Sequence, residues 1–210
     1  MVKIKNIKKE EKEKFKLKPK EKLLKYLIEN KNPQSIRTAS KAIVIDYKNT
    51  YNLVSELQPE IISKEKVGNT NLIKINLKSS PEIYSVESKR TEEFLSKNLK
   101  LKVVKSYIDS LNYPFLIVLV FGSYVKNTRT ENSDIDICII SDDKAKINEL
   151  QEKLSLLSLK IESQEFTIKE FISMIEKTQN NLGHEIVKNN IILYGVENYY
   201  NLISKWMKKE

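Results

Sequence analysis

The stretch FGSYVKNTRTENSDIDICII, residues 121–140, decides how this 210-residue chain can fold. It completes the apolar run FLIVLVF, residues 115–121, which has the length and composition of a strand buried on both faces. Gly122 and Ser123 end that run. A glycine here lets backbone amides approach a ligand closely, and a short helical turn after it offers unpaired N–H groups and a hydroxyl to a phosphate. The sequence therefore predicts a phosphate-binding turn at Gly122 and Ser123.

Two aspartates begin the next strand. Asp134 and Asp136 are two residues apart, so their carboxylates project from one face of a strand while Ile135 and Ile137 pack on the other. Two close carboxylates repel each other and resist burial unless a divalent cation neutralises them. Oxygen ligands favour Mg²⁺, which takes substrate phosphates as further ligands. The alternative is that Asp134 is an ordinary turn residue at the start of the strand, because Asp-x-Asp also occurs by chance.

Composition and charge restrict the classes of protein. A net charge of +9 and a sequence pI near 9.3 favour contact with polyanions, nucleic acid above all. Residues 1–22 hold ten lysines against four glutamates, which predicts either an arm that follows phosphates or a solvated terminus. The single cysteine, Cys138, lies in an aliphatic run and is typical of a small buried hydrophobe. Without an apolar run of about 18 residues or an apolar signal segment, we expect a cytoplasmic protein that contacts no membrane.

The first third of the chain has the element order of a winged helix-turn-helix. Apolar spacing predicts helices over residues 20–30, 34–41 and 47–57, and the period then changes to two around a turn at Gly68 and Asn69. In this arrangement the third helix enters the major groove of duplex DNA and the hairpin reaches neighbouring backbone. Such units also serve as protein docking modules, which is the alternative. The candidate DNA contacts are Tyr47, Lys48, Asn49, Asn52, Lys64, Lys66 and Lys74.

The central stretch resembles the core motif of the polymerase-beta-like nucleotidyltransferase superfamily, in particular its minimal members. The motif is Gly-Ser, nine residues, then Ser-Asp-Ile-Asp, all after an aliphatic strand. In that superfamily the Gly-Ser turn holds the triphosphate and the two aspartates bind two metal ions. The resemblance therefore implies that Gly122 and Ser123 bind a nucleoside triphosphate such as ATP, and that Asp134 and Asp136 bind two Mg²⁺ ions.

The resemblance also implies the organisation of the whole chain. The chain is similar to archaeal-type DNA-binding proteins that carry a nucleotidyltransferase domain. We expect an α+β fold in which a basic arm, residues 1–19, precedes a winged helix-turn-helix, residues 20–80. A nucleotidyltransferase α/β domain with a mixed sheet then occupies residues 81–210.

Two features depart from the superfamily pattern. Asn127 stands where a second glycine is usual, and asparagine tolerates a left-handed backbone, so we expect the turn to survive. The third carboxylate has two candidates of opposite parity on the next strand, Glu162 and Glu165, of which at most one faces the metal ions. We take Glu165 as the third catalytic carboxylate and Lys126 as a nucleotide-binding cation. Lys126 or Arg129 would neutralise charge on the leaving phosphates; the alternative is that both are plain surface residues of a loop.

Three functions are compatible with these residues. The first is a metal-dependent enzyme that transfers a nucleoside monophosphate from a triphosphate to an acceptor, releases pyrophosphate and is guided by a DNA-binding winged helix. The second is a transcriptional regulator whose nucleotidyltransferase domain is inactive and serves as nucleotide sensor or dimerisation platform. The third is an enzyme that modifies a partner protein with nucleotides. A homodimer is compatible with the first two, because winged-helix proteins often pair to read two half-sites.

Overall fold

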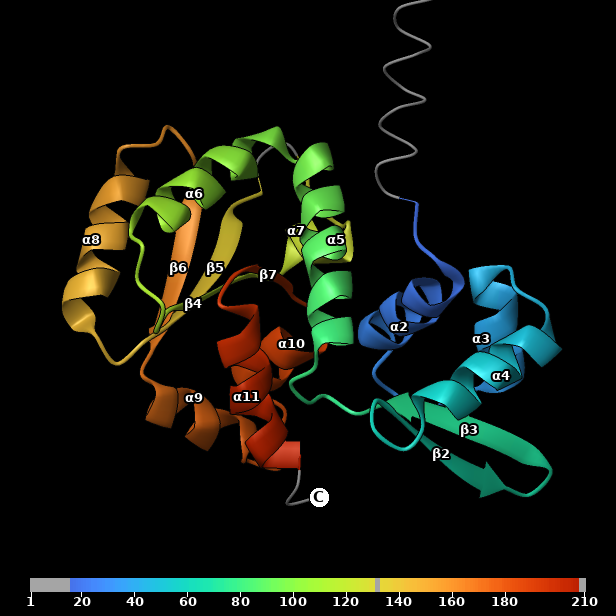
Figure 1. The fold of residues 1–210 in the computed structure, drawn as a ribbon. Coiled ribbons are helices and arrows are strands. Elements are labelled where there is room, and N and C mark those ends of the chain that lie inside the picture. The colour runs from blue at the N-terminus through green and yellow to red at the C-terminus, as the bar shows by residue number, and fades with distance from the viewer. Residues whose placement is uncertain (1–15, 131–132, 208–210) are drawn as a thin grey trace, which may run out of the picture. The chain divides into compact units, whose positions relative to one another are not determined.

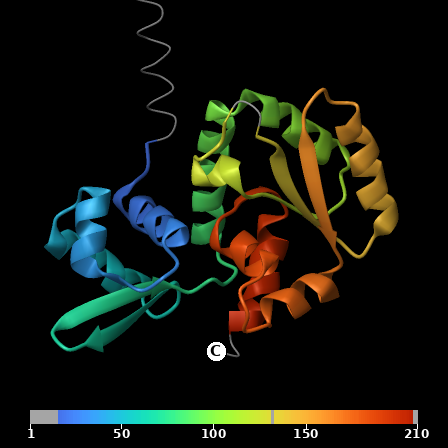
Figure 2. The same cartoon turned by 180° about the vertical axis from the view of Figure 1, so that it is seen from behind.

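The computed structural model describes residues 16–130 and 133–207, so the predicted basic arm lies largely outside the described residues. The chain divides into two compact units, with the boundary between Asn76 and Leu77 (Figures 1 and 2). In the described part of the chain, no helix is both long and apolar enough to cross a membrane.

The first unit consists of three helices and a three-stranded antiparallel sheet in the order β1-β3-β2. Its elements are α2 (Pro19–Glu29), β1 (Gln34–Ser35), α3 (Ile36–Ile43), α4 (Tyr47–Leu57), β2 (Ile62–Val67) and β3 (Thr70–Ile75). Helix α4 begins where predicted because the Asp46 carboxylate accepts a hydrogen bond from the Asn49 N–H and so caps its first turn. The second helix begins later than predicted, at Ile36, because Ser35 is extended and caps it.

The hairpin of the first unit follows the predicted alternation. Gly68 and Asn69 form the two-residue turn, and Val67 pairs with Thr70 across it. Ile73 and Ile75 face the core of the unit and are almost fully buried. The period of two and the turn are therefore confirmed.

The second unit is built around a four-stranded sheet. Its elements are α5 (Pro81–Lys97), α6 (Leu99–Ser110), β4 (Ile117–Val120), α7 (Ser123–Lys126), β5 (Ile135–Ile140), α8 (Lys144–Ser155), β6 (Ile161–Phe166), α9 (Ile168–Ile175), α10 (Leu182–Lys188), β7 (Ile191–Tyr194) and α11 (Val196–Met207). The strand order is β6-β5-β4-β7. Strand β4 runs antiparallel to β5 and β7, whereas β5 and β6 are parallel, with α8 as the connection between them. The sheet is therefore mixed, as predicted.

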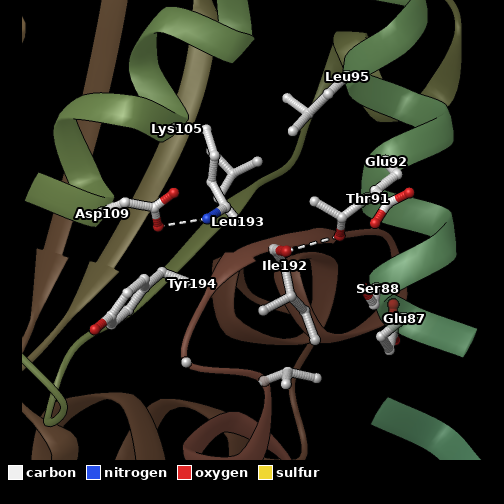
Figure 3. A pocket seen from close by; sticks show the side chains of 12 residues that line it. Glu87, Ser88, Thr91, Glu92, Leu95, Lys105, Asp109, Ile192, Leu193 and Tyr194 are labelled. Atoms are coloured by element: carbon white, nitrogen blue, oxygen red, sulfur yellow. Dashed lines mark hydrogen bonds and ion pairs between the residues drawn. The ribbon is translucent and has the colours of Figure 1, made fainter. Parts of the chain in front are cut away.

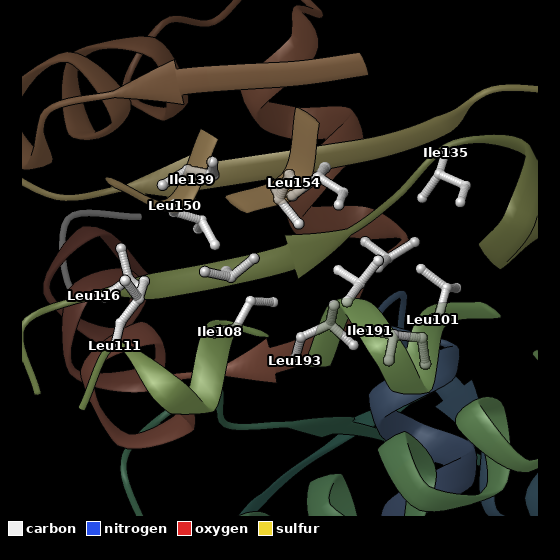
Figure 4. Close-up of a cluster of buried hydrophobic side chains, with 14 of the residues drawn as sticks. Leu101, Ile108, Leu111, Leu116, Ile135, Ile139, Leu150, Leu154, Ile191 and Leu193 are labelled. Atoms are coloured by element: carbon white, nitrogen blue, oxygen red, sulfur yellow. The ribbon is translucent and has the colours of Figure 1, made fainter. Parts of the chain in front are cut away.

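One hydrophobic core of the second unit lies between one face of the sheet and helices α6 and α8 (Figure 4). Alternate residues of the strands supply it, among them Val118, Val120, Ile137 and Ile139. All of β4 is buried, which confirms the buried central strand, but Phe115 at the start of the apolar run is exposed. The prediction that the whole run is buried is wrong at that residue, because β4 begins only at Ile117.

Candidate functional site

The Gly122 turn lies directly against the carboxylate of Asp136. The Phe121 N–H donates to the Asp136 carbonyl at 3.1 Å, so the end of β4 is held beside β5. Gly122 has φ +68°, and a Cβ atom on it would lie 1.9 Å from Oδ2 of Asp136. A side chain cannot occupy that space, so the glycine is required by both its conformation and its neighbour. The predicted close approach at Gly122 is thus explained by a carboxylate as well as by any ligand.

The short helix α7 follows this turn. The Ser123 N–H is hydrogen-bonded to the Asp136 carboxylate. Asn127 ends the helix in the left-handed conformation, with φ 55° and ψ 29°. The prediction that asparagine maintains the turn in place of a second glycine is therefore confirmed.

Four carboxylates, those of Asp134, Asp136, Glu162 and Glu185, interact around this turn and form a carboxylate cluster. Burial raises the pKa of the half-buried Asp136 above its ordinary value, and the charges of Glu162, Asp134 and Glu185 raise it further, in that order. The hydrogen bond from the Ser123 N–H acts in the opposite direction but does not outweigh them. The group thus concentrates negative charge beside the Gly122 turn.

The third carboxylate of the group comes from the neighbouring strand. In the parallel register of β5 and β6, Asp136 pairs with Glu162, whereas Glu165 pairs with Ile139. Paired residues of adjacent strands share a face, and Ile139 points into the core formed with α6 and α8. The structure therefore brings Glu162, and not Glu165, to Asp136. The expectation that Glu165 is the third catalytic carboxylate is therefore wrong, because Glu165 lies on the face of the sheet opposite Asp136.

A fourth carboxylate comes from helix α10. Glu185 forms an ion pair with Lys126 at the end of α7, and both side chains are partly exposed. Sequence reasoning missed Glu185, because nothing in its local sequence distinguishes it from any other helical glutamate. It also proposed Lys126 as a nucleotide ligand without this partner. Arg129 lies elsewhere: its guanidinium contacts the Asn98 side chain and lies 4.9 Å from the centre of the Tyr124 ring.

The carboxylate cluster provides the kind of ligand that a divalent cation binds. Ionised carboxylates offer only acceptor oxygens, which are the ligands that Mg²⁺ takes. Burial and, after it, repulsion by the neighbouring carboxylates raise the pKa of Asp136. Among the residues that the structure describes, no three His, Cys, Asp or Glu side chains converge closely enough to form a complete metal cage.

A separate hollow of about 390 Å³ lies between α5, α6 and β7 (Figure 3). Its walls include Thr91, Lys105, Asp109 and Tyr194. The Gly122 turn and Asp136 do not line this hollow, so it is separate from the carboxylate cluster.

The candidate DNA contacts of the first unit fall on two surfaces. Tyr47, Lys48, Asn49 and Asn52 are exposed on α4, although Asn49 also bonds the capping carboxylate of Asp46. On the hairpin, Lys64 and Lys66 pair with Ile73 and Asn71, whereas Lys74 pairs with Ser63 on the opposite face. Lys64 Nζ lies 4.9 Å from the centre of the Tyr51 ring, next to α4. The hairpin lysines therefore do not form one surface.

Comparison with known proteins agrees with the arrangement of the second unit. The family model "Polymerase beta, Nucleotidyltransferase" matches residues 102–198, which include the Gly122 turn and all four carboxylates. A protein of Methanocaldococcus jannaschii named "putative protein adenylyltransferase" is 31% identical over 98 residues, which are 44% of this chain and 70% of that protein. The chain belongs to the polymerase beta nucleotidyltransferase family.

As a nucleotidyltransferase, the chain is an enzyme of the class that transfers a nucleoside monophosphate. A chain from a crystal structure of a toxin–antitoxin with AMP-PNP is 23% identical, with a TM-score of 0.33, covering 50% of this nucleotidyltransferase and 86% of that chain.

Proposed function

We propose that this nucleotidyltransferase transfers a nucleoside monophosphate from a triphosphate, ATP in the first instance, to a protein acceptor in a metal-dependent reaction. One observation carries the proposal: the Asp136 carboxylate lies against the Gly122 turn with Glu162 beside it on β6. This joins a candidate phosphate site to a candidate metal site. The name of the Methanocaldococcus relative, a protein adenylyltransferase, supports a protein acceptor.

In the proposed reaction, the acceptor hydroxyl oxygen forms a bond to the α-phosphorus, and the bond from that phosphorus to the bridging oxygen breaks. Pyrophosphate leaves with the electron pair of that bond. Asp134 and Asp136 would hold Mg²⁺, which would supply charge neutralisation and lower the pKa of the acceptor hydroxyl. Glu162, whose Oε1 accepts a hydrogen bond from Gln164 Nε2, would receive the acceptor proton on its other carboxylate oxygen.

The Gly122 turn would orient the triphosphate. The backbone of the turn and the Ser123 hydroxyl would donate to phosphate oxygens, as expected where a glycine allows close approach. Lys126 would then exchange Glu185 for the leaving phosphates. This ion pair is partly exposed, and such pairs contribute only about 0–1 kcal/mol to stability, so breaking it costs little free energy.

The experiment that tests this function follows label from each of four α-labelled nucleoside triphosphates, with Mg²⁺ or Mn²⁺, onto the protein or onto acceptors in a cell extract. Asp136→Asn removes the charge at the centre of the group. Glu165→Gln is the matched control, because it removes a carboxylate from the opposite face of the sheet. Transfer by the native protein and the control, but not by Asp136→Asn, is the expected result. Equal transfer by all three would refute the assignment.

We further propose that the first unit is a winged helix-turn-helix that binds duplex DNA. Three observations support it: the element order from α2 to β3, the sheet order β1-β3-β2, and the exposed polar surface of α4 beside Lys64. The contacts would come from α4 and from Lys64 and Lys66. Lys74, on the other face of the hairpin, is retained only as a backbone contact.

Fluorescence anisotropy with labelled duplex DNA at several salt concentrations tests this second function. Replacement of Lys48 and Lys64 by alanine should weaken binding and reduce the salt slope by about one unit for each phosphate that the variant no longer neutralises. A Lys22→Ala variant, on the exposed side of α2, is the control. If DNA binding is intact while no acceptor receives label, the protein is instead a regulator whose nucleotidyltransferase domain is inactive. Light scattering then shows whether that regulator is a monomer or a dimer.

A further inference from the structure

The two outer strands of the sheet in the second unit differ in how their free edges are covered. Along β7, two side chains of α5 bond the outward carbonyl groups. Thr91 Oγ1 donates to the Ile192 carbonyl at 2.8 Å, as Figure 3 shows, and Arg90 Nη2 donates to the Asn190 carbonyl at 3.3 Å. The edge of β7 is thus closed by its own unit.

The edge of β6 is open. The Ile135 N–H donates to the Lys160 carbonyl and the Ser141 N–H to the Phe166 carbonyl, so the even-numbered residues of β6 bond to β5. The odd-numbered residues Ile161, Ser163 and Glu165 therefore direct their N–H and C=O groups outward. Within residues 16–130 and 133–207, no hydrogen bond reaches these outward groups. None of the six residues of β6 is buried, whereas β4 is buried throughout.

This open edge adjoins the carboxylate cluster. Glu162 belongs to β6 itself and is paired with Asp136. A strand added beside β6 would lie about 5 Å beyond it, and so about 10 Å from β5. Side chains on the face that carries Glu162 would then point toward the surroundings of Asp136.

We propose that the outer edge of β6 receives an extended segment of the acceptor protein and so presents its hydroxyl residue to Asp136 and Glu162. This inference rests on the proposed function. The added strand would bond to Ile161, Ser163 and Glu165, which is the geometry of recognition by strand addition. The transferred group then forms its new bond to a serine, threonine or tyrosine oxygen of that strand, pyrophosphate leaves, and Glu162 takes the hydroxyl proton.

The charges of β6 indicate the composition of the segment. Glu162 and Glu165 are exposed on opposite faces of the strand, in a protein that is otherwise strongly basic. Lysine or arginine residues on both faces of the added strand would pair with them across the ladder. A second copy of β6 would bring no basic residue, because its sequence IESQEF contains none. Charge complementarity therefore favours a basic acceptor over a second copy of this chain.

A proline at Ser163 tests the edge without touching the site. The Ser163 N–H points outward, so proline removes a donor that β5 does not use and obstructs an incoming strand. We expect Ser163→Pro to keep the native melting temperature within about 4 °C and ATP affinity within about twofold, but to lower transfer to protein acceptors in extract about tenfold or more. Ser163→Ala, which retains the N–H, should transfer like the native protein. Full transfer by Ser163→Pro would overturn the inference.

A second measurement does not depend on activity. Amide hydrogen exchange is followed at residues 161, 163 and 165 with Lys-Thr or Glu-Thr peptides of about ten residues, the length of a long strand. Their sequences repeat Lys-Lys-Thr-Thr or Glu-Glu-Thr-Thr, so that each face of the added strand carries both residue types. Protection by the Lys-Thr peptide alone at about 1 mM is expected. Protection by neither peptide, or by both equally, would overturn the inference. A native dimer that dissociates in the Ser163→Pro variant would also overturn it, because the edge would then bind a second copy of the chain. If no acceptor receives label but the Lys-Thr peptide protects these amides, the proposed function fails while the edge remains a binding surface.

Discussion

Replacing Gly122 with alanine tests the geometry of the site most directly. The new Cβ would lie 1.9 Å from Oδ2 of Asp136, whereas real Cβ contacts essentially never fall below 3.0 Å. The carboxylate must therefore retreat by about 1.1 Å, the difference between these distances. The backbone of Gly122, with φ 68° and ψ −144°, is also one that other residues rarely adopt.

The size of the effect follows from these two costs. A non-glycine residue in this conformation costs about 1–3 kcal/mol. Displacement of the Asp136 carboxylate weakens its hydrogen bond from the Ser123 N–H, which adds about 1 kcal/mol for a partly exposed acceptor. We expect Gly122→Ala to lower the free energy of unfolding by about 2–4 kcal/mol. Nucleotide transfer should be lost, because Asp136 no longer lies where the turn holds it.

Urea unfolding followed by circular dichroism measures the stability, and label transfer measures the activity. The double variant Gly122→Ala with Asp136→Ala removes the obstructing carboxylate, so the cost of the alanine should fall to the backbone strain, about 1–3 kcal/mol. Ser123→Ala retains its N–H and should change stability by less than about 1 kcal/mol. If Gly122→Ala is as stable and as active as the native protein, the close packing of turn and carboxylate is refuted. A cost that is unchanged in the double variant would refute the steric part alone.

The remaining predictions concern the carboxylates and the buried thiol. Glu162→Gln should lower kcat/KM for transfer about 100-fold. Glu165→Gln, which removes only one exposed pair with the acceptor strand, should lower it by no more than about fivefold, and equal losses would contradict the parity of β6. Calorimetric titration with ATP should show about tenfold weaker binding for Lys126→Ala and somewhat tighter binding for Glu185→Gln, because the carboxylate competes for the ammonium; unchanged affinity in both variants would argue against that competition. The Cys138 thiol, whose pKa burial raises far above its usual range, should resist a thiol reagent at pH 8 until urea unfolds the protein, and rapid labelling of the native protein would show that the strand is exposed.

Local signals in the chain accounted for most individual elements. The third helix was expected over residues 47–57 and is α4, Tyr47–Leu57, because Asp46 caps its start and Pro59 follows its end. The alternation around Gly68 and Asn69 predicted the hairpin, and the apolar run before Gly122 predicted a buried strand. These features depend on residues a few positions apart, whose spacing and turn chemistry the sequence states directly.

The sequence by itself determined the pair Asp134 and Asp136 and the glycine turn before them, because covalent spacing on a strand sets which side chains share a face. It could not choose between Glu162 and Glu165, since either parity suits an isolated strand. Only the register of β6 against β5 decided that choice. Glu185 also reaches the site only because the fold brings α10 close enough to α7 for an ion pair between Glu185 and Lys126. Contacts between residues this far apart in the chain depend on how whole elements bury their apolar faces together, which no local pattern of residues encodes.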